Sequence, residues 1–177
     1  MHRRHFIGVS SALAAGSMAG CLGLWDNPDT PEDMDVEILD DEGRSPRRRI
    51  VESGLVESDE EHPKFEGVLV VTAENEADEY FLSDEKVTSF VAETHFDESY
   101  LVAIVTFWWS GEDEVTVGAI DRTDEGIHVA LNVDSPDPAT LEATPRTHLL
   151  RITDERSEIP GVIVVAHNDR EERIRID

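Results

Sequence analysis

One unbroken apolar run sets the strongest constraint on how this chain can fold. Residues 100–109 read Tyr-Leu-Val-Ala-Ile-Val-Thr-Phe-Trp-Trp, so β-branched and aromatic residues occupy most positions. Successive side chains of a strand point to opposite faces, so a strand that is apolar on both faces must be covered on both sides. The run therefore predicts a central strand of a sheet, with other elements packed above and below it.

The segments around this run predict further strands and two short helices. Strand patterns occupy residues 67–72, 114–122, 127–134, 146–153, 161–167 and 172–176, with weaker ones at 36–39 and 49–56. In the strand at 114–122, Val115, Val117 and Ala119 are expected on one face. Asn75 and Ser83 are the predicted starts of the helices. The pattern predicts a mainly β (α+β) fold: an antiparallel β-sandwich or open barrel, with one or two short helices before the central strand.

The first 21 residues have the features of an export signal. They combine a basic start, an apolar middle from Phe6 to about residue 15, and a small-residue end. The middle is too short to span a membrane, which needs roughly 20 apolar residues. The adjacent Arg3 and Arg4 before Phe6 resemble a twin-arginine signal. Met18, Ala19, Gly20 and Cys21 resemble the lipobox of bacterial and archaeal lipoproteins, in which small residues fit a peptidase groove and the thiol takes a lipid.

This segment predicts a location and a domain organisation. Cys21 is the only cysteine and stands where a lipobox requires it; the alternative is an ordinary leader with an incidental cysteine. We expect a signal peptide at 1–20, a lipidated Cys21 with an acidic, proline-containing tether at 21–46, and one β-rich domain at 47–177. The domain would then be anchored through its lipid to the outer side of the cell membrane.

The charge of the chain indicates the solvent for which it is built. Without Arg3 and Arg4 the 15 basic residues fall to 13 against 40 acidic ones, and the net charge changes from −25 to −27. Only Lys64 and Lys86 are lysines. Self-repulsion of this size destabilises a compact domain at low salt, but at molar salt the Debye length is only about 3 Å. Together with the leader, this composition resembles secreted proteins of halophilic archaea. It also argues against nucleic acid as a partner, because phosphate contacts need clustered Lys and Arg.

No group of residues has the spacing that catalysis or metal binding requires. Ser99, Ser110, His95 and His148 could be combined into a hydrolytic group, but there is no G-x-S-x-G motif, and chance pairings are expected among so many acids and histidines. The five histidines of the mature chain are scattered, without the close pairs of a zinc site: His62, His95, His128, His148 and His167. The acidic runs at 121–126 and 40–43 lack EF-hand spacing and are predicted to be solvated turns. We therefore expect no cofactor, no metal and no enzymatic activity.

Three segments resemble a known small β domain. They are residues 69–81, residues 96–102 (Phe-Asp-Glu-Ser-Tyr-Leu-Val) and residues 146–152 (Arg-Thr-His-Leu-Leu-Arg-Ile). An apolar strand, a short acidic helix, Phe-Asp-x-Ser and a late His before two apolar residues occur in this order in accessory subunits of bacterial protease complexes and in many uncharacterised lipoproteins. The resemblance covers about residues 67–153 and implies a non-enzymatic accessory module. The turn at 110–113 departs from the family because it lacks an aromatic residue, which weakens any binding role of that loop.

These observations favour one function over two alternatives. The leading hypothesis is a lipid-anchored extracellular domain of a halophile that binds another protein at the cell envelope. The first alternative is a surface lipoprotein that binds a small ligand or a cation through an acidic loop or an exposed tryptophan of the pair Trp108–Trp109. The second alternative is an unrecognised hydrolase.

Overall fold

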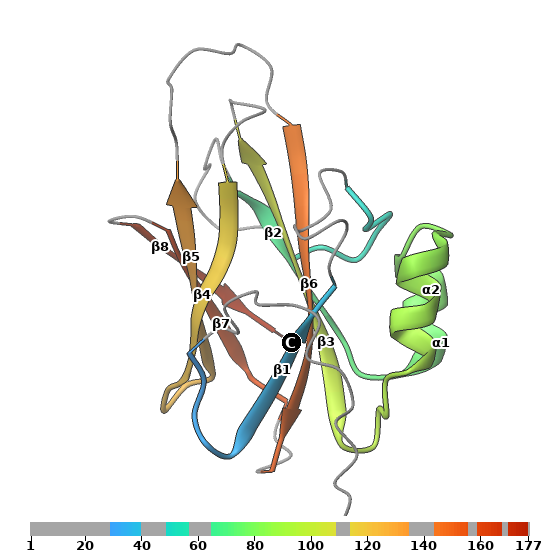
Figure 1. Cartoon of the computed structure of the whole chain (residues 1–177), viewed down its shortest axis with the longest axis horizontal. Coiled ribbons are helices and arrows are strands. Elements are labelled where there is room, and N and C mark those ends of the chain that lie inside the picture. Colours follow the sequence, from blue (N-terminus) through green and yellow to red (C-terminus); the bar gives the residue numbers. More distant parts are fainter. Residues whose placement is uncertain are drawn as a thin grey trace, which may run out of the picture.

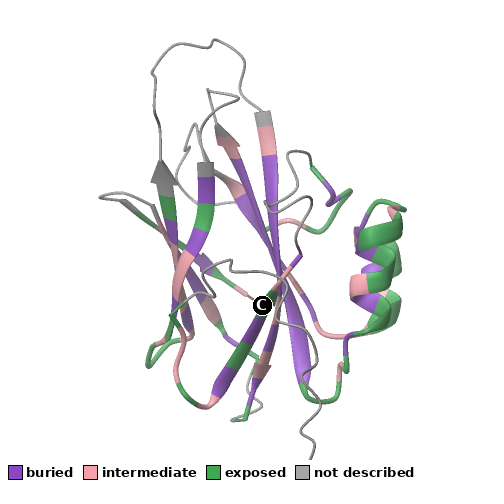
Figure 2. Ribbon diagram, viewed as in Figure 1, coloured by how far each residue is buried: buried purple, intermediate pink, exposed green. Residues whose placement is uncertain are grey.

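The apolar run forms β3 (Ser99–Trp108), which occupies an inner position in a four-stranded antiparallel sheet. In this computed structural model β3 lies between β2 (Phe65–Val71) and β6 (Thr144–Asp154), and β1 (Met34–Ile38) borders β6 at the edge. The β3 residues from 101 to 106 are each at most 1% exposed, and Figure 2 shows both inner strands as mostly buried. The prediction of a central strand covered on both faces is therefore confirmed.

A second sheet packs against the first across a hydrophobic core. The structure describes residues 29–39, 49–56, 65–108, 114–134, 144–155, 159–167 and 170–176. Within these ranges β4 (Glu114–Arg122), β5 (Ile127–Asp134), β7 (Val162–His167) and β8 (Arg170–Arg175) form a sheet in the order β4-β5-β7-β8. The two sheets lie face to face (Figure 1), so the predicted β-sandwich is confirmed.

Two details of the second sheet differ from the prediction. β5 and β7 are parallel, so the sandwich is not wholly antiparallel. Parallel neighbours need a crossover connection, and here β6 in the opposite sheet supplies it. In β4 a bulge lies between Val117 and Ala119, so Ile120 replaces Ala119 as the next core residue and is 0% exposed.

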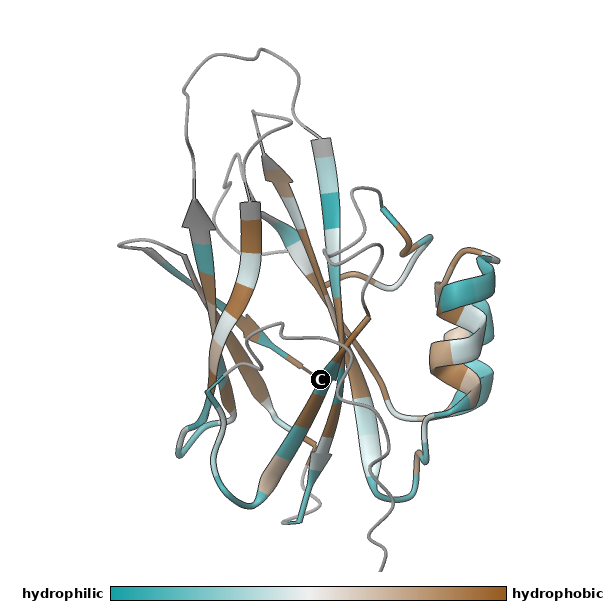
Figure 3. Ribbon diagram, in the orientation of Figure 1, coloured by the Kyte–Doolittle hydropathy of each residue, from teal (hydrophilic) through white to brown (hydrophobic). Residues whose placement is uncertain are grey.

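Two helices cover the outer face of the first sheet. α1 (Glu74–Tyr80) and α2 (Glu85–Ala92) pack Ala77, Val87 and Val91 onto the strands, and Figure 3 shows hydrophobic residues along this contact. The second core cluster therefore lies between helices and sheet, while the first lies between the two sheets.

Both helix starts differ from the predicted ones by one or two residues. α2 is capped by Asp84 rather than Ser83, because the Asp84 carboxylate accepts two backbone N–H groups of the first turn, at 3.1 and 3.3 Å. α1 follows Ala73 rather than Asn75 and has no side-chain cap.

Arg151 of β6 fixes the end of α2 on the sheet. Its Nη2 donates to the backbone oxygen of Phe90 at 2.6 Å, and its Nε donates to Thr94 Oγ1 at 3.0 Å. The guanidinium also lies 4.3 Å from the centre of the Phe90 ring and pairs with Glu37 of β1. A cation at the carbonyl end of a helix complements its dipole, so this side chain joins β1, β6 and α2.

The folded domain begins earlier in the chain than predicted. Residues 29–39 lie within the predicted tether at 21–46, in which only residues 36–39 were a possible strand. Asp29 pairs with Ala119 of β4, however, and β1 pairs with β6 along its whole length. Asp29 donates to the Gly118 oxygen at 3.0 Å and accepts the Ile120 N–H at 2.8 Å. This N-terminal strap, residues 29–39, thus contacts both sheets in turn, so these residues pack as part of the folded domain.

Candidate functional site

The N-terminal strap, β4 and β6 meet at one end of the sandwich in a cluster of charged side chains. Arg122, the last residue of β4, donates from Nη2 to Asp154 Oδ1 at 2.6 Å and from Nε to Asp154 Oδ2 at 3.2 Å. Its Nη1 donates to Asp33 Oδ1 at 3.0 Å. Asp154 ends β6 and Asp33 precedes β1, so one guanidinium joins the two sheets and the strap. We call these three residues the clamp.

The clamp is shielded from water to different degrees. The side chain of Asp154 is 5% exposed, that of Arg122 17% and that of Asp33 31%. Hydrogen bonds to Asp154 and then Asp33 raise the pKa of Arg122 above its usual value, while burial opposes this effect. Because two carboxylates surround one guanidinium, the clamp carries a net negative charge, and most donors of Arg122 are already used.

Tyr100 lies behind the clamp in the core. The residue is 5% exposed, and its hydroxyl makes no hydrogen bond within the part of the chain that the structure describes. Burial, followed by the negative charge of Asp154, raises the pKa of Tyr100, whereas Arg122 lowers it. The phenol therefore stays neutral beside the acidic group.

A pocket of about 280 Å³ opens over the clamp. Its wall consists of the β4–β5 turn from Arg122 to Ile127, together with Asp154 and residues 159–161. Thr123 shapes the turn, because its Oγ1 accepts the backbone N–H groups of Glu125 and Gly126 at 3.3 and 3.1 Å. We call this hollow the clamp pocket. The part of the acidic run that follows β4, residues 123–126, is thus a turn, as predicted, and it forms one wall of a cavity.

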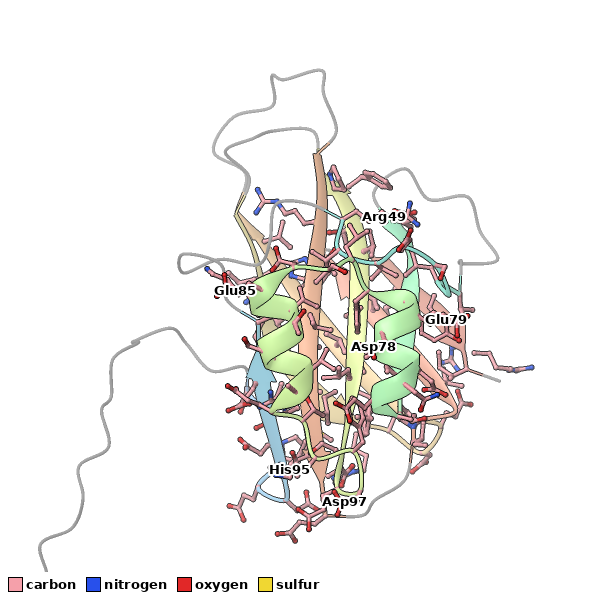
Figure 4. All side chains as sticks on the ribbon, turned by 90° about the vertical axis from the view of Figure 1, so that its right-hand side faces the viewer. Arg49, Asp78, Glu79, Glu85, His95 and Asp97 are labelled. Carbon is pink, nitrogen blue, oxygen red and sulfur yellow. The ribbon has the colours of Figure 1, made fainter. Side chains whose placement is uncertain are left out.

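A second hollow, of about 110 Å³, lies between α1 and α2. Figure 4 looks onto this helical face, where exposed Asp78, Glu79, Glu85 and Asp97 lie among few basic groups. His95 is exposed in the loop below α2. The hollow is the smaller of the two, and its floor belongs to the core under the helices.

A polar group also lies inside the sandwich near the other end of β6. Arg146, His148 and Thr106 of β3 are 0–1% exposed. The Thr106 Oγ1 and His148 Nε2 atoms are 3.5 Å apart. Burial, followed by repulsion from Arg146, lowers the pKa of His148 to about 3. This imidazole is therefore neutral at ordinary pH and serves packing, as expected for a buried histidine.

Among the described candidates for a hydrolytic group, Ser99 and His95 lie next to each other, because the Ser99 N–H donates to the His95 backbone oxygen at 2.9 Å, but His148 lies apart from Ser99. Ser99 hydrogen-bonds Thr153 through its hydroxyl at 2.7 Å and lies on the β3 face that carries the helices. His148 pairs with Ile104 on the opposite face, five residues and roughly 17 Å further along the strand. Ser110 lies outside the described residues.

Several other predicted positions can be compared with the structure. His128 Nε2 is 3.7 Å from Glu171 Oε1 on the outer sheet face. His62, residues 40–43, Trp109, the turn at 110–113 and the side chains of Trp108 and His167 lie outside what the structure describes. No group of three or more potential ligands that could hold a metal ion occurs among the described residues.

The leader residues Arg3, Arg4, Phe6, Met18, Ala19, Gly20 and Cys21 also lie outside the described ranges. Across the ranges that are described, no helix is long and apolar enough to cross a membrane.

The clamp was missed by sequence reasoning. Arg122 and Asp154 are 32 residues apart, and Arg122 and Asp33 are 89 apart, so no local spacing links them. One signal was available: Arg122 is the only basic residue in the acidic run at 121–126, where it could neutralise neighbouring carboxylates.

Compared with known proteins, the chain matches no family model, no curated sequence and no solved structure. Its resemblance to the accessory-subunit domain therefore stays a prediction.

Proposed function

We propose that this protein is a lipid-anchored, non-enzymatic binding domain on the outer face of a halophile's cell membrane, where it contacts another envelope protein. One observation carries the proposal. The only cysteine of the chain, Cys21, directly follows Met18-Ala19-Gly20 after a basic and apolar leader. The lipid would attach there and hold the domain at the membrane.

The position of the N-terminal strap supports an anchored domain. Asp29 already hydrogen-bonds β4, and it follows Cys21 by only eight residues. Eight extended residues span at most about 28 Å. A lipid on Cys21 would therefore keep the β4 edge of the sandwich close to the bilayer, and the strap would transmit any pull into both sheets.

The charge of the chain supports a salty exterior. The 15 basic residues are too few to offset the repulsion among 40 acidic ones, which leaves a net charge of −25. At molar salt the Debye length is about 3 Å and this repulsion is largely screened, so a protein of this composition is suited to brine.

The anchoring test is substitution of the cysteine. In cells grown at molar salt, the wild-type chain is expected in the membrane fraction, released only by detergent, with a lipid on Cys21 found by mass spectrometry of the N-terminal peptide. Cys21→Ser has no thiol to alkylate, so it should stay unprocessed or leave the membrane, while Ser17→Ala should behave as wild type. A lipid-modified membrane pool of normal size in Cys21→Ser would refute the proposal.

The export route is tested separately. Replacing Arg3 and Arg4 together by lysine keeps the charge but removes the twin-arginine pair. We expect the precursor to accumulate inside the cell. Normal export of this variant would exclude the twin-arginine route without affecting the lipid anchor.

A ligand-binding lipoprotein is the second candidate function. The observation that favours it is the clamp pocket of about 280 Å³ with its acidic wall. Thermal unfolding at molar salt with a panel of sugars, amino acids and divalent cations tests it. A saturable rise in the unfolding temperature with one of them would favour this candidate over a protein partner.

A further inference from the structure

We propose that the clamp pocket receives an arginine side chain of the partner protein, next to an apolar residue of that partner. This inference rests on the proposed function, because it names the chemistry by which the binding domain recognises its partner.

The charge of the pocket favours binding of a cationic group. Arg122 is already bonded to Asp154 and Asp33, so an anionic ligand would meet carboxylates and few open donors. Glu125 on the rim pairs with Arg173. Asp124 is exposed and makes no ion pair within the described part of the chain, so it can accept a new cation at the mouth.

The apolar wall of the pocket favours a side chain over an inorganic ion. Ile159 is 54% exposed, the highest value among the large hydrophobic residues that the structure describes. Pro160 and Ile127 continue this wall into the pocket. A hydrated metal ion gains nothing from such a surface, whereas the methylene stem of an arginine or a neighbouring leucine does.

The volume of the pocket limits the size of the group that it can bind. At about 280 Å³ it is near the lower end of the roughly 300–1,000 Å³ of small-molecule sites, so it has room for one long side chain. Guanidinium is more weakly hydrated than ammonium, and planar enough to pair with a carboxylate while lying on an apolar surface. At molar salt these properties favour arginine over lysine, because contact pairs and apolar burial persist when long-range attraction is screened.

The test uses two capped peptides that differ in one residue. The full chain, purified in detergent at molar NaCl and labelled with ¹⁵N, is titrated with acetyl-Ala-Arg-Leu-amide or acetyl-Ala-Gln-Leu-amide. The amide signals of Gly126 and Gly161 report on the two sides of the pocket. We expect a saturable shift of both signals with the arginine peptide and about tenfold weaker binding of the glutamine peptide, as for one lost charge-assisted contact.

Variants assign the binding to the pocket. Asp124→Asn and Ile159→Ser both change exposed side chains and should each weaken binding of the arginine peptide about fivefold to tenfold. Asp121→Asn, an exposed acid of β4 that does not line the pocket, is the matched control and should leave binding unchanged.

Three results would overturn the inference. One is equal binding of the two peptides, a second is an equal loss in Asp121→Asn, and a third is displacement of the arginine peptide by millimolar CaCl₂ that itself saturates the Gly126 and Gly161 signals. None of these results bears on the lipid anchor, which Cys21→Ser tests by membrane fractionation, so failure of the pocket and failure of the proposed function can be told apart.

Discussion

Gly126 lies too close to the backbone of β7 for a side chain to fit without a shift. A Cβ placed on Gly126 would lie 1.9 Å from the Val162 oxygen and 2.8 Å from its carbonyl carbon. Both are backbone atoms of β7, so no side-chain rotation relieves the contact. Val162 would have to retreat by roughly 1.5 Å to reach ordinary contact distance. It pairs with Arg175 and precedes Ile163, a fully buried residue that pairs with Ile127, so the shift would disturb both neighbours of β7.

The expected cost of Gly126→Ala follows from two opposing terms. Overpacking of this kind costs about 1–3 kcal/mol, and a contact between two hydrogen-bonded backbones belongs at the upper end. Alanine also restricts the unfolded chain more than glycine does, which raises the free energy of unfolding by about 0.4–1 kcal/mol. The net loss in the free energy of unfolding should therefore be about 2–2.6 kcal/mol. Gly161→Ala is the matched control, because its Cβ would meet nothing closer than the Glu125 oxygen at 4.0 Å.

Urea unfolding at a fixed molar NaCl concentration measures both variants. Gly126→Ala should lower the midpoint without changing the slope, and its melting temperature should fall by roughly 4–12 °C for a domain of this size. Gly161→Ala should unfold as wild type or at slightly higher urea. If the two variants unfold within about 0.5 kcal/mol of each other, the close approach of the β4–β5 turn to β7 is wrong.

Two further predictions concern buried ionisable side chains. Arg122→Met leaves Asp154 and Asp33 without their shared cation, so the free energy of unfolding measured in urea should fall by about 3–5 kcal/mol. Arg122→Lys keeps a positive charge, so its loss should be smaller. An unchanged unfolding midpoint in Arg122→Met would contradict the clamp. Burial lowers the pKa of His148 to about 3 from 6.5, so the unfolded chain binds more protons between these values and stability falls as the pH falls through that window. Between pH 7 and 5 the loss should be about 2 kcal/mol, and it should be absent in His148→Leu; the same loss in that variant would assign it to other groups.

The parts of the fold that the sequence predicted are those with local signals. The doubly apolar run places β3 inside a sheet wherever its partners come from, and alternation identifies β4 and β5 in the same way. The bulge at Gly118 was not predicted. The Asn132 side chain of the neighbouring strand lies where a Cβ of Gly118 would be, and no local sequence pattern encodes such a cross-strand contact. The bulge shifts Ile120 into the core in place of Ala119 and reverses the face of every later β4 residue.

The N-terminal strap and the clamp were not predicted because both depend on contacts between residues far apart in the sequence. The prolines and acids around Met34 are typical of a tether. The strand that pairs with Met34 is β6, more than a hundred residues later, so no local pattern indicates that Met34 is buried. The clamp depends on that pairing: Met34 opposite Asp154 brings Asp33 to the end of β6, and only then can Arg122 reach both carboxylates. A site assembled by strand register cannot be read from spacing, whereas an export signal or lipobox, as proposed for Arg3, Arg4 and Cys21, is a linear motif that spacing can reveal.

Salt offers the sharpest separation between the surface of this protein and its interior. Exposed pairs such as Arg173–Glu125, about 62% and 61% exposed, are screened at molar salt, but the Arg122–Asp154 pair is largely shielded. Diluting the protein from molar salt to about 0.1 M lengthens the Debye length from about 3 to about 10 Å and restores repulsion among the surface carboxylates. The free energy of unfolding should therefore fall on dilution, by the same amount in wild type and in Arg122→Met, since the clamp contributes equally at both salt concentrations. Parallel stability curves against salt would assign the dependence to the surface; curves that converge at low salt would mean that the clamp itself needs salt, and salt-independent unfolding of the wild type would contradict an adaptation to brine.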